Sequence, residues 1–444
     1  MKRVILFFSA VALLCSASAQ EQKEAALSLT LQQAIDIALS ESPTIKIADQ
    51  EIEIKRYAKQ GTYASLYPQI DATAQYQRMF AIQTVHTDMG SFKMGKDNSF
   101  NGGLSAAMPV INTQLWEKLK VSVGELELAI EKARSSRIDM IEQVTKAYYS
   151  VLLAKESLIV YQRVYDNAIE NNKNVKKRYD VGSVSEYDLI TSNVSVQNAI
   201  PNVIEAENSI TLSLWQLKAL LGIDLTKNID VVGSLMDYEA EMNHAHTLEQ
   251  LSLANNSTLR QLDMQEELLR RAVRISKLAN VPTLSINAAY LYTAQGNDGN
   301  FFVGKLWNPY SYAGVQLNIP IFAGTSRRAA TRQANLNLSN LQLQRENTER
   351  QIQVSVVQNL SNMQTYVKQF QSASASVGQA NRGYEIAVKR YEVGSGTLVD
   401  IDNSQTALTQ AEMTRNMAVF NFLSSKVSLD KIIGNYEYNY SRNK

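Results

Sequence analysis

The longest stretches of the chain repeat apolar residues at intervals of three and four, the spacing of one face of an α-helix. One stretch, after Pro320, carries the apolar series Ile352, Val356, Leu360, Met363, Val367 and Phe370. A second lies between Pro109 and Pro201, and neither contains a proline, which would break a helix interior. A continuous helix over residues 113–178 would be on the order of 100 Å long at ~1.5 Å per residue. We therefore predict very long helices that pack as coiled coils.

Four shorter segments alternate apolar and polar residues with a period of two, as a strand with one apolar face does. PQIDATAQYQ begins at Pro68 and TLSINAAYLY at Thr283, and each has a downstream partner, FNGGLSAAMPV from Phe100 and YAGVQLNIPI from Tyr312. Loops that contain Gly, Asp and Asn separate the partners, which is typical of hairpins. The expected strands lie near residues 69–80, 99–108, 283–293 and 310–319.

Two segments of the chain are almost copies of one another. KKRYDVGSVSEYDLITS begins at Lys176 and VKRYEVGSGTLVDIDNS at Val388, and a similar offset relates Pro68 to Pro282 and Pro109 to Pro320. We therefore expect a tandem duplication over residues 20–232 and 233–444, a period far longer than that of a solenoid repeat. Each copy contains a helix, a hairpin, a long helix, a turn and another helix. The hairpins are expected at about 68–110 and 282–320, and the turns at 179–184 and 391–396.

The start of the chain predicts a secretory signal peptide over residues 1–19. Lys2 and Arg3 precede an apolar run, and small residues follow it up to Ala19. The only cysteine, Cys15, raises lipid attachment as an alternative, but Leu14 stands where that cleavage needs a small residue. After residue 19 the chain has no cysteine, which excludes disulfides and thiolate metal sites. No later run of 18 apolar residues predicts a transmembrane helix, although strands could still cross a membrane.

Composition offers little support for an enzyme or a nucleic-acid-binding protein. The formal net charge is +1, and neither a phosphate-binding glycine loop nor a His-Glu-x-x-His motif occurs. The three histidines are His86, His244 and His246, and the last two lack further ligands for a metal. We interpret them as part of a solvated linker between the two halves. We expect no enzymatic activity, cofactor, metal or nucleic-acid partner.

The two near-identical turns have a clear structural interpretation. Gly182 and Gly394 are placed to end a helix in the left-handed conformation. Ser185 with Asp188, and Thr397 with Asp400, have the spacing of a capping box that begins the next helix. Helix capping is therefore the alternative to any functional role of these acids.

The order of these elements, with a Tyr-acid-Val-Gly-Ser turn before a helix with Asp, resembles the TolC-like family of outer-membrane efflux proteins. The resemblance extends from LTLQQAIDIALSESPTI at Leu29 to LDKIIG at Leu429. It implies a mixed α and β membrane protein in the bacterial outer membrane, with its helical part in the periplasm. Three chains would form one transmembrane β-barrel with four strands from each, continuous with a coiled-coil α-helical barrel.

The resemblance also implies a function and partners. The homotrimer would be a passive exit duct for small molecules or secreted polypeptide, joined by a periplasmic membrane-fusion adaptor to an inner-membrane pump. A periplasmic coiled-coil scaffold without a channel is the alternative. Strand polarity suits a duct in outer-membrane lipid. Residues expected to face water are Asp71, Thr73, Gln75, Ser285 and Asn287, and those expected to face lipid are Ile70, Tyr76, Leu284, Ile286 and Tyr290.

The same resemblance gives the turns two roles. The residues that match the family's adaptor-contacting tips are Tyr179, Val181, Gly182, Ser183, Tyr391, Val393, Gly394 and Ser395. Those assigned to the periplasmic gate are Asp188, Tyr391, Asp400, Asp402 and Asn403. Asn403 stands at the family's second acidic position, with Asp402 beside it. We also expect a contact between Tyr391 and Asp188, and a break or bend at Pro201 that the equivalent Met413 does not impose.

Overall fold

The computed structural model describes residues 27–88, 90–243, 252–297 and 307–435. The predicted signal peptide, His244 and His246 therefore lie outside the described residues. The chain divides into two compact units. The tip unit comprises Met1–Pro43, Asp139–Gln250 and Gln358–Asp430, and the sheet unit comprises Thr44–Ile138, Leu251–Val357 and Lys431–Lys444. Each unit draws on both halves of the sequence, so both expected repeats contribute to both units.

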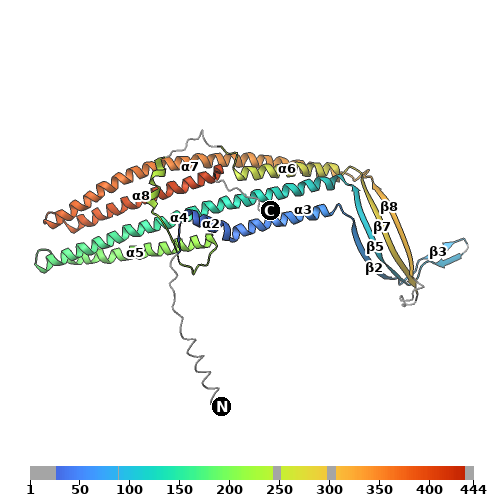
Figure 1. Cartoon of the computed structure of the whole chain (residues 1–444), viewed down its shortest axis with the longest axis horizontal. Helices are drawn as coiled ribbons and strands as arrows, with labels where there is room; N and C mark the ends of the chain where they lie inside the picture. Colours follow the sequence, from blue (N-terminus) through green and yellow to red (C-terminus); the bar gives the residue numbers. More distant parts are fainter. Residues whose placement is uncertain (1–26, 89, 244–251, 298–306, 436–444) are drawn as a thin grey trace, which may run out of the picture. The chain divides into compact units, whose positions relative to one another are not determined.

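The predicted long helices are confirmed (Figure 1). α4 has 68 residues and α7 has 67, and each is followed by a helix of 36 residues. Among the described residues, none of the helices combines the length and hydropathy needed to cross a bilayer. The helices are α2 (Leu31–Glu41), α3 (Pro43–Ala64), α4 (Thr113–Asp180), α5 (Glu186–Leu221), α6 (Ser257–Leu278), α7 (Ser326–Glu392) and α8 (Leu398–Ile433), with a 3₁₀ helix at Leu235–Asn243.

Of the break or bend expected at Pro201, the break does not occur, because α5 continues through this residue; the bend stays a prediction. Proline has no N–H to donate to the carbonyl of Gln197, four residues earlier. Both residues are exposed, so water can reach that carbonyl. The helix therefore tolerates the missing hydrogen bond without ending.

All four predicted strands occur, and they form one antiparallel sheet in the order β2-β5-β7-β8. The strands are β2 (Gln69–Arg78), β5 (Asn98–Ile111), β7 (Thr283–Gly296) and β8 (Trp307–Asn318). Two small sheets were not predicted: β3 (Thr84–Thr87) pairs with β4 (Gly90–Lys93), and β1 (Leu27–Leu29) pairs with β6 (Ile229–Val231).

The register of the sheet separates polar from apolar side chains as the alternation predicts. Ala72, Leu104 and Tyr290 are partners on neighbouring strands, and so are Asp71, Ser105 and Ala289 on the other face. The apolar face is widely exposed in the single chain, at Ile70, Tyr76, Leu104, Met108, Ile286, Tyr290, Val315 and Leu317. On the opposite face, the side-chain amide of Asn287 donates to Gln316 at 3.1 Å. An exposed apolar face of this extent needs an apolar environment.

In the tip unit, a buried tyrosine joins α4 to the small sheet of β1 and β6. The Tyr148 hydroxyl donates to the carbonyl of Val232 and lies 3.3 Å from that of Leu29. Burial, with Tyr238 nearby, raises the pKa of Tyr148 to about 12. The phenol therefore remains a neutral donor at physiological pH.

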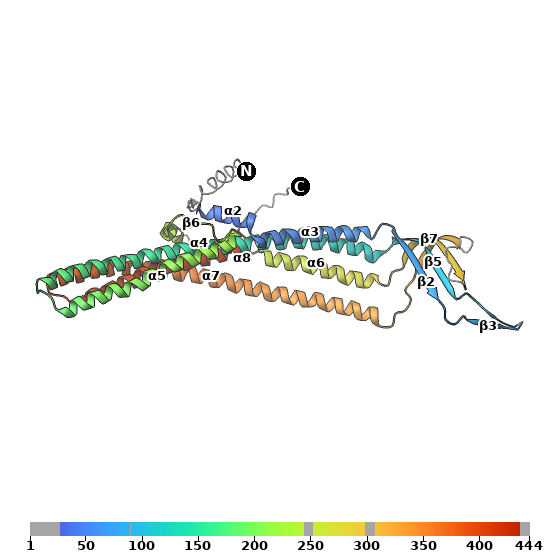
Figure 2. The same cartoon turned by 90° about the horizontal axis from the view of Figure 1, so that it is seen from below.

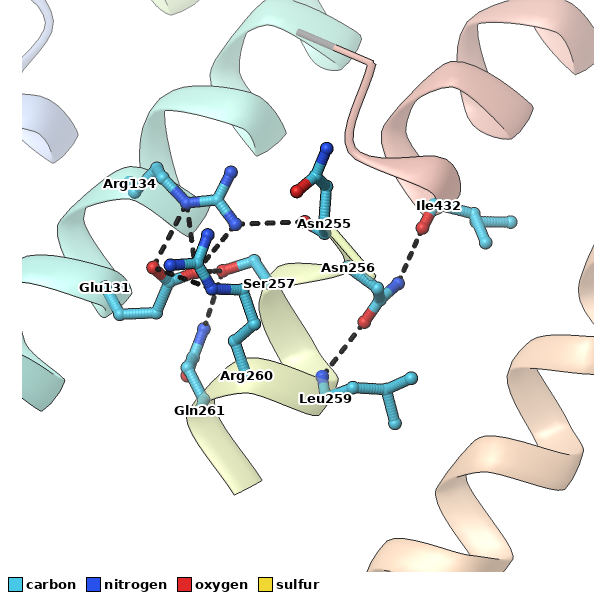
Figure 3. Close-up of polar contacts among 9 residues, drawn as sticks. All are labelled: Glu131, Arg134, Asn255, Asn256, Ser257, Leu259, Arg260, Gln261 and Ile432. Carbon is cyan, nitrogen blue, oxygen red and sulfur yellow. Dashed lines mark hydrogen bonds and ion pairs between the residues drawn. The ribbon is translucent and has the colours of Figure 1, made fainter. Parts of the chain in front are cut away.

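In the sheet unit, a buried carboxylate organises the start of α6 (Figure 3). Glu131 on α4 accepts from Arg134 at 2.8 Å and from the Ser257 hydroxyl at 2.7 Å. The neighbouring Asn256 side chain donates to the carbonyl of Ile432 at 2.7 Å. Because Glu131 is only 5% exposed, these charge-assisted hydrogen bonds are needed to offset its lost hydration. They tie α4, the start of α6 and the end of α8 together.

Gly103→Ala is expected to weaken the sheet. A Cβ on Gly103 would lie 2.3 Å from the carbonyl oxygen of Tyr290 and 2.7 Å from the Cα of Leu291. The cost should be about 1–3 kcal/mol, as for other overpacked interiors. Gly314→Ala is the matched control, since its Cβ would meet no atom within 4 Å. Guanidinium unfolding followed by tryptophan fluorescence should show a lower midpoint for Gly103→Ala alone, and equal midpoints would contradict the close approach.

Candidate functional site at the helical turns

The first turn joins α4 to α5 and has the predicted geometry. Gly182 has a φ of +72°, and its N–H donates to the carbonyl of Tyr179 at 2.8 Å. The Ser185 hydroxyl oxygen accepts from the N–H of Asp188 at 3.2 Å, while the Asp188 carboxylate accepts from the N–H of Ser185 at 3.1 Å. The left-handed glycine and the capping box are therefore confirmed.

The second turn, between α7 and α8, repeats this geometry. Gly394 has a φ of +76°, and its N–H donates to the carbonyl of Tyr391 at 3.0 Å. Asp400 accepts from both the N–H and the hydroxyl of Thr397 at 2.9 Å. Each turn is thus fixed by hydrogen bonds within its own segment.

The two turns lie at one end of the tip unit and pack against each other (Figure 1, Figure 2). Their shared core contains Val175 from α4 and Tyr391 from α7. Arg178 crosses between them: its Nη1 donates to the carbonyl of Tyr391 at 2.8 Å, and its guanidinium lies 5.0 Å from the centre of the Tyr391 ring. This cation–π contact was not predicted, although both residues belong to the duplicated segment.

The expected hydrogen bond between Tyr391 and Asp188 does not form. The Tyr391 hydroxyl is buried and has no hydrogen-bond partner among the described residues. The Asp188 carboxylate is instead occupied by the N–H and hydroxyl of Ser185, at 3.1 and 2.8 Å. Burial raises the pKa of Tyr391, and the charge of Asp188 raises it further, while Arg178 lowers it. Asp188 therefore acts on Tyr391 only through its charge.

Exposure divides the residues matched to the adaptor-contacting tips. Val181 is 77% exposed and Val393 is 79% exposed, and Ser183 and Ser395 are also exposed. Tyr179 is 38% exposed, whereas Tyr391 is buried. A partner at this end would therefore meet the valines and serines, while Tyr391 supports the turn from within.

A row of exposed apolar residues on α5 was missed. Tyr187, Ile190 and Val194 are 70%, 54% and 49% exposed and follow one another by three and four residues, which places them on one face of the helix. The spacing is visible in the sequence. Only the solvent exposure of these side chains, which the structure gives, distinguishes such a row from the buried face of a helix.

The acids assigned to the gate have different environments. The N–H and hydroxyl of Thr397 hold the pKa of Asp400 below its usual value, with a smaller contribution from Arg390. Partial burial raises the pKa of Asp402, although the hydroxyl of Ser195 donates to it at 3.1 Å. Asp402 lines a cavity of about 250 Å³ among α4, α5 and α8, together with Asn167, Asn171, Asn198, Asn202 and Gln405. Asn403 is exposed.

Comparison with known proteins places the chain among outer-membrane channels. The family model "Outer membrane efflux protein" matches residues 34–223 and 248–435. The alkaline protease secretion protein AprF of Pseudomonas aeruginosa is 24% identical, covering 91% of this chain and 84% of AprF. The outer membrane protein TolC of Vibrio cholerae is 20% identical, with coverages of 84% and 83%. The Campylobacter jejuni CmeC outer membrane channel superimposes with a TM-score of 0.74 at 20% identity, covering 94% of this chain and 90% of CmeC.

Tyr391→Phe is expected to leave the turns as stable as before, or slightly more stable, because it removes a buried hydroxyl without a partner. Arg178→Gln should instead cost about 1–2 kcal/mol, since the cation–π contact and the hydrogen bond to the Tyr391 carbonyl are weakened. Amide hydrogen exchange at residues 391–401 reports both changes. Faster exchange in Tyr391→Phe than in Arg178→Gln would show that the hydroxyl has a stabilising partner.

Proposed function

Because the chain belongs to the outer membrane efflux protein family, we propose that it forms the outer-membrane exit duct of a tripartite export system. It is an outer-membrane protein whose helical part lies in the periplasm. In this role it passively conducts substrates that an inner-membrane pump delivers. One observation carries the proposal: the four-stranded sheet has a widely exposed apolar face and two unpaired edge strands. A channel of this kind performs no chemistry of its own, and no catalytic residue is assigned.

The edges of the sheet support a homotrimer. Among the residues that the structure describes, β2 and β8 each pair with one neighbouring strand only, and lipid offers no hydrogen bonds to the free backbone groups on their other sides. Pairing of β8 with β2 of another copy satisfies both edges and closes a barrel. Three chains would contribute twelve strands, four from each. The apolar face would then meet outer-membrane lipid, and the face of Asp71 and Asn287 would line water.

The tips support docking of a periplasmic adaptor. Val181 and Val393 are widely exposed at the two turns, and the α5 row of Tyr187, Ile190 and Val194 continues this apolar surface. Exposed apolar residues in such a row fit a helical partner that packs by side-chain interdigitation. Because a trimer would carry each turn three times, six tips would be available to the adaptor.

The gate is proposed at the second turn. In a trimer, Asp400 would become three like charges around one axis, and in the single chain its hydrogen bonds from Thr397 lower its pKa and so favour the ionised form. Asp402 differs because its carboxylate accepts from the Ser195 hydroxyl on α5 of its own chain at 3.1 Å, and partial burial there raises its pKa. Asp400 therefore carries the proposed charge ring, and Asp402 supports the packing beside it.

Asp400→Asn tests the ring. The wild-type protein in planar bilayers should conduct, and Asp400→Asn should lower cation selectivity and relieve block by multivalent cations. An asparagine still caps a helix, so stability should change by less than about 1 kcal/mol. Asp402→Asn is the matched control and should leave selectivity unchanged.

Unchanged selectivity in Asp400→Asn would leave Asp400 as a helix cap only. Absence of any wild-type conductance, together with release of the protein by osmotic shock, would instead favour the scaffold without a channel.

Gly394→Pro should abolish export while the protein remains in the outer membrane. Proline cannot adopt the φ of +76° found here, and the sheet belongs to a different compact unit from the turn. Gly394→Asn is the matched control, because asparagine tolerates the left-handed conformation and should preserve export. A photoreactive residue at position 395 should capture the adaptor in wild type and in Gly394→Asn. Normal export and capture in Gly394→Pro would refute docking at this tip.

A further inference from the structure

A cavity of about 500 Å³ lies where the chain passes from strand β8 to helix α7. Its lining comes from the end of α6, the segment after β8 and the first turns of α7, all within the sheet unit. Ile321 and Phe322 on this segment are 91% and 86% exposed. The cavity therefore combines a helical wall with two apolar side chains that are free to meet a hydrocarbon.

The helical wall is basic. Lys277, Arg327, Arg328 and Arg332 line the cavity. Arg327 donates to the carbonyl of Pro320 at 3.0 Å. Within the part of the chain that the structure describes, the side chains of Lys277, Arg328 and Arg332 have neither an ion pair nor a hydrogen bond. Three cations thus face one cavity without a counterion.

The sequence around the cavity provides no counterion either. From Leu268 to Arg345, Asp298 is the only acidic residue. A neighbouring copy that paired its β2 with β8 would bring residues 54–70 toward this edge. That segment contains Lys55, Arg56 and Lys59 but no Asp or Glu. Lys55 and Arg56 already pair with Glu125 and Glu53 of their own chain, so this segment would bring no unpaired acid to the cavity, and an anion of another molecule can balance its cations.

We propose that this cavity binds the phosphate headgroup of an anionic phospholipid in the periplasmic leaflet of the outer membrane. The inference rests on the proposed function, because the sheet has to span that membrane for its helical end to lie at the headgroups. Lys277, Arg328 and Arg332 hold the phosphate, as basic pockets at membrane interfaces do. Ile321 and Phe322 contact the first part of the acyl chains. A free phosphate ion would use the cations but gain nothing from these two side chains.

The test is native mass spectrometry of the full-length protein in detergent, titrated with phosphatidylglycerol. The double variant Arg328→Gln/Arg332→Gln should bind this lipid roughly tenfold more weakly, because two headgroup contacts are lost. The matched control is Arg270→Gln/Arg350→Gln, which removes the same charge from two exposed arginines already paired with Glu266 and Glu346. It should bind as wild type does. Phosphatidylcholine, which has no net charge, should bind wild type more weakly.

Two further measurements identify the source of the phosphate. Phe322→Ser should weaken phosphatidylglycerol binding, and millimolar inorganic phosphate should not displace the lipid. Complete displacement by inorganic phosphate would overturn the lipid assignment in favour of a free anion. Equal lipid binding by the double variant and wild type would also overturn the lipid assignment. So would loss of the trimer in the double variant, because that result would place Arg328 and Arg332 in contacts between chains. Wild-type conductance is recorded separately, so failure of the duct is distinguishable from failure of the lipid site.

Discussion

The rest of the architecture depends on one requirement, that backbone N–H and C=O groups in lipid are hydrogen-bonded within the protein. β5 and β7 meet it on both sides, whereas β2 and β8 meet it on one side only. A single chain in a bilayer would therefore leave two rows of polar groups unpaired, at a cost of several kcal/mol for each group. If several chains pair β8 of one with β2 of the next into a closed barrel, no strand keeps an unpaired edge. In the proposed trimer, oligomerisation would follow from backbone chemistry, and the side chains of the edge strands would need only to permit it.

The surrounding membrane also accounts for where charge gathers. The face of Ile70 and Tyr290 carries no acidic residue on the four strands, so it cannot contribute counterions at its ends; the opposite face holds Asp71 and Asn287, together with Leu291, Tyr310 and Tyr312. Cations can gather just beyond the strands, where headgroup phosphates are available. Lys277 lies shortly before β7 in the sequence, and Arg327, Arg328 and Arg332 lie in the first turns of α7, after β8. If the proposed phosphate site is occupied, a cluster that would repel itself in a soluble protein would help to fix the depth of the sheet in the membrane.

Features set by local interactions could be predicted from the sequence. The long helices, the left-handed Gly182 and Gly394 and the capping boxes each depend on residues close together in the chain. The pairing of β1 with β6 was missed because three-residue strands carry no readable period. The expected hydrogen bond from Tyr391 to Asp188 was wrong because Ser185, three residues from Asp188, already donates to that carboxylate. A donor close in the chain, such as Ser185, prevails over a distant one when both can reach the same carboxylate.

Because each turn is fixed by hydrogen bonds within its own segment, the two repeats of the turn can serve different purposes. Each glycine and each capping box sets the backbone of its turn without help from the other repeat, so the remaining side chains are left to form contacts between the turns. The buried ring of Tyr391 can therefore serve as a platform for Arg178, while its counterpart Tyr179 is half-exposed. Likewise, Asp402 in the second repeat accepts a hydrogen bond from Ser195 in the first repeat of the same chain. Duplication supplied two stable turns, and the sequences of the two repeats could diverge at the side chains that form contacts between these turns.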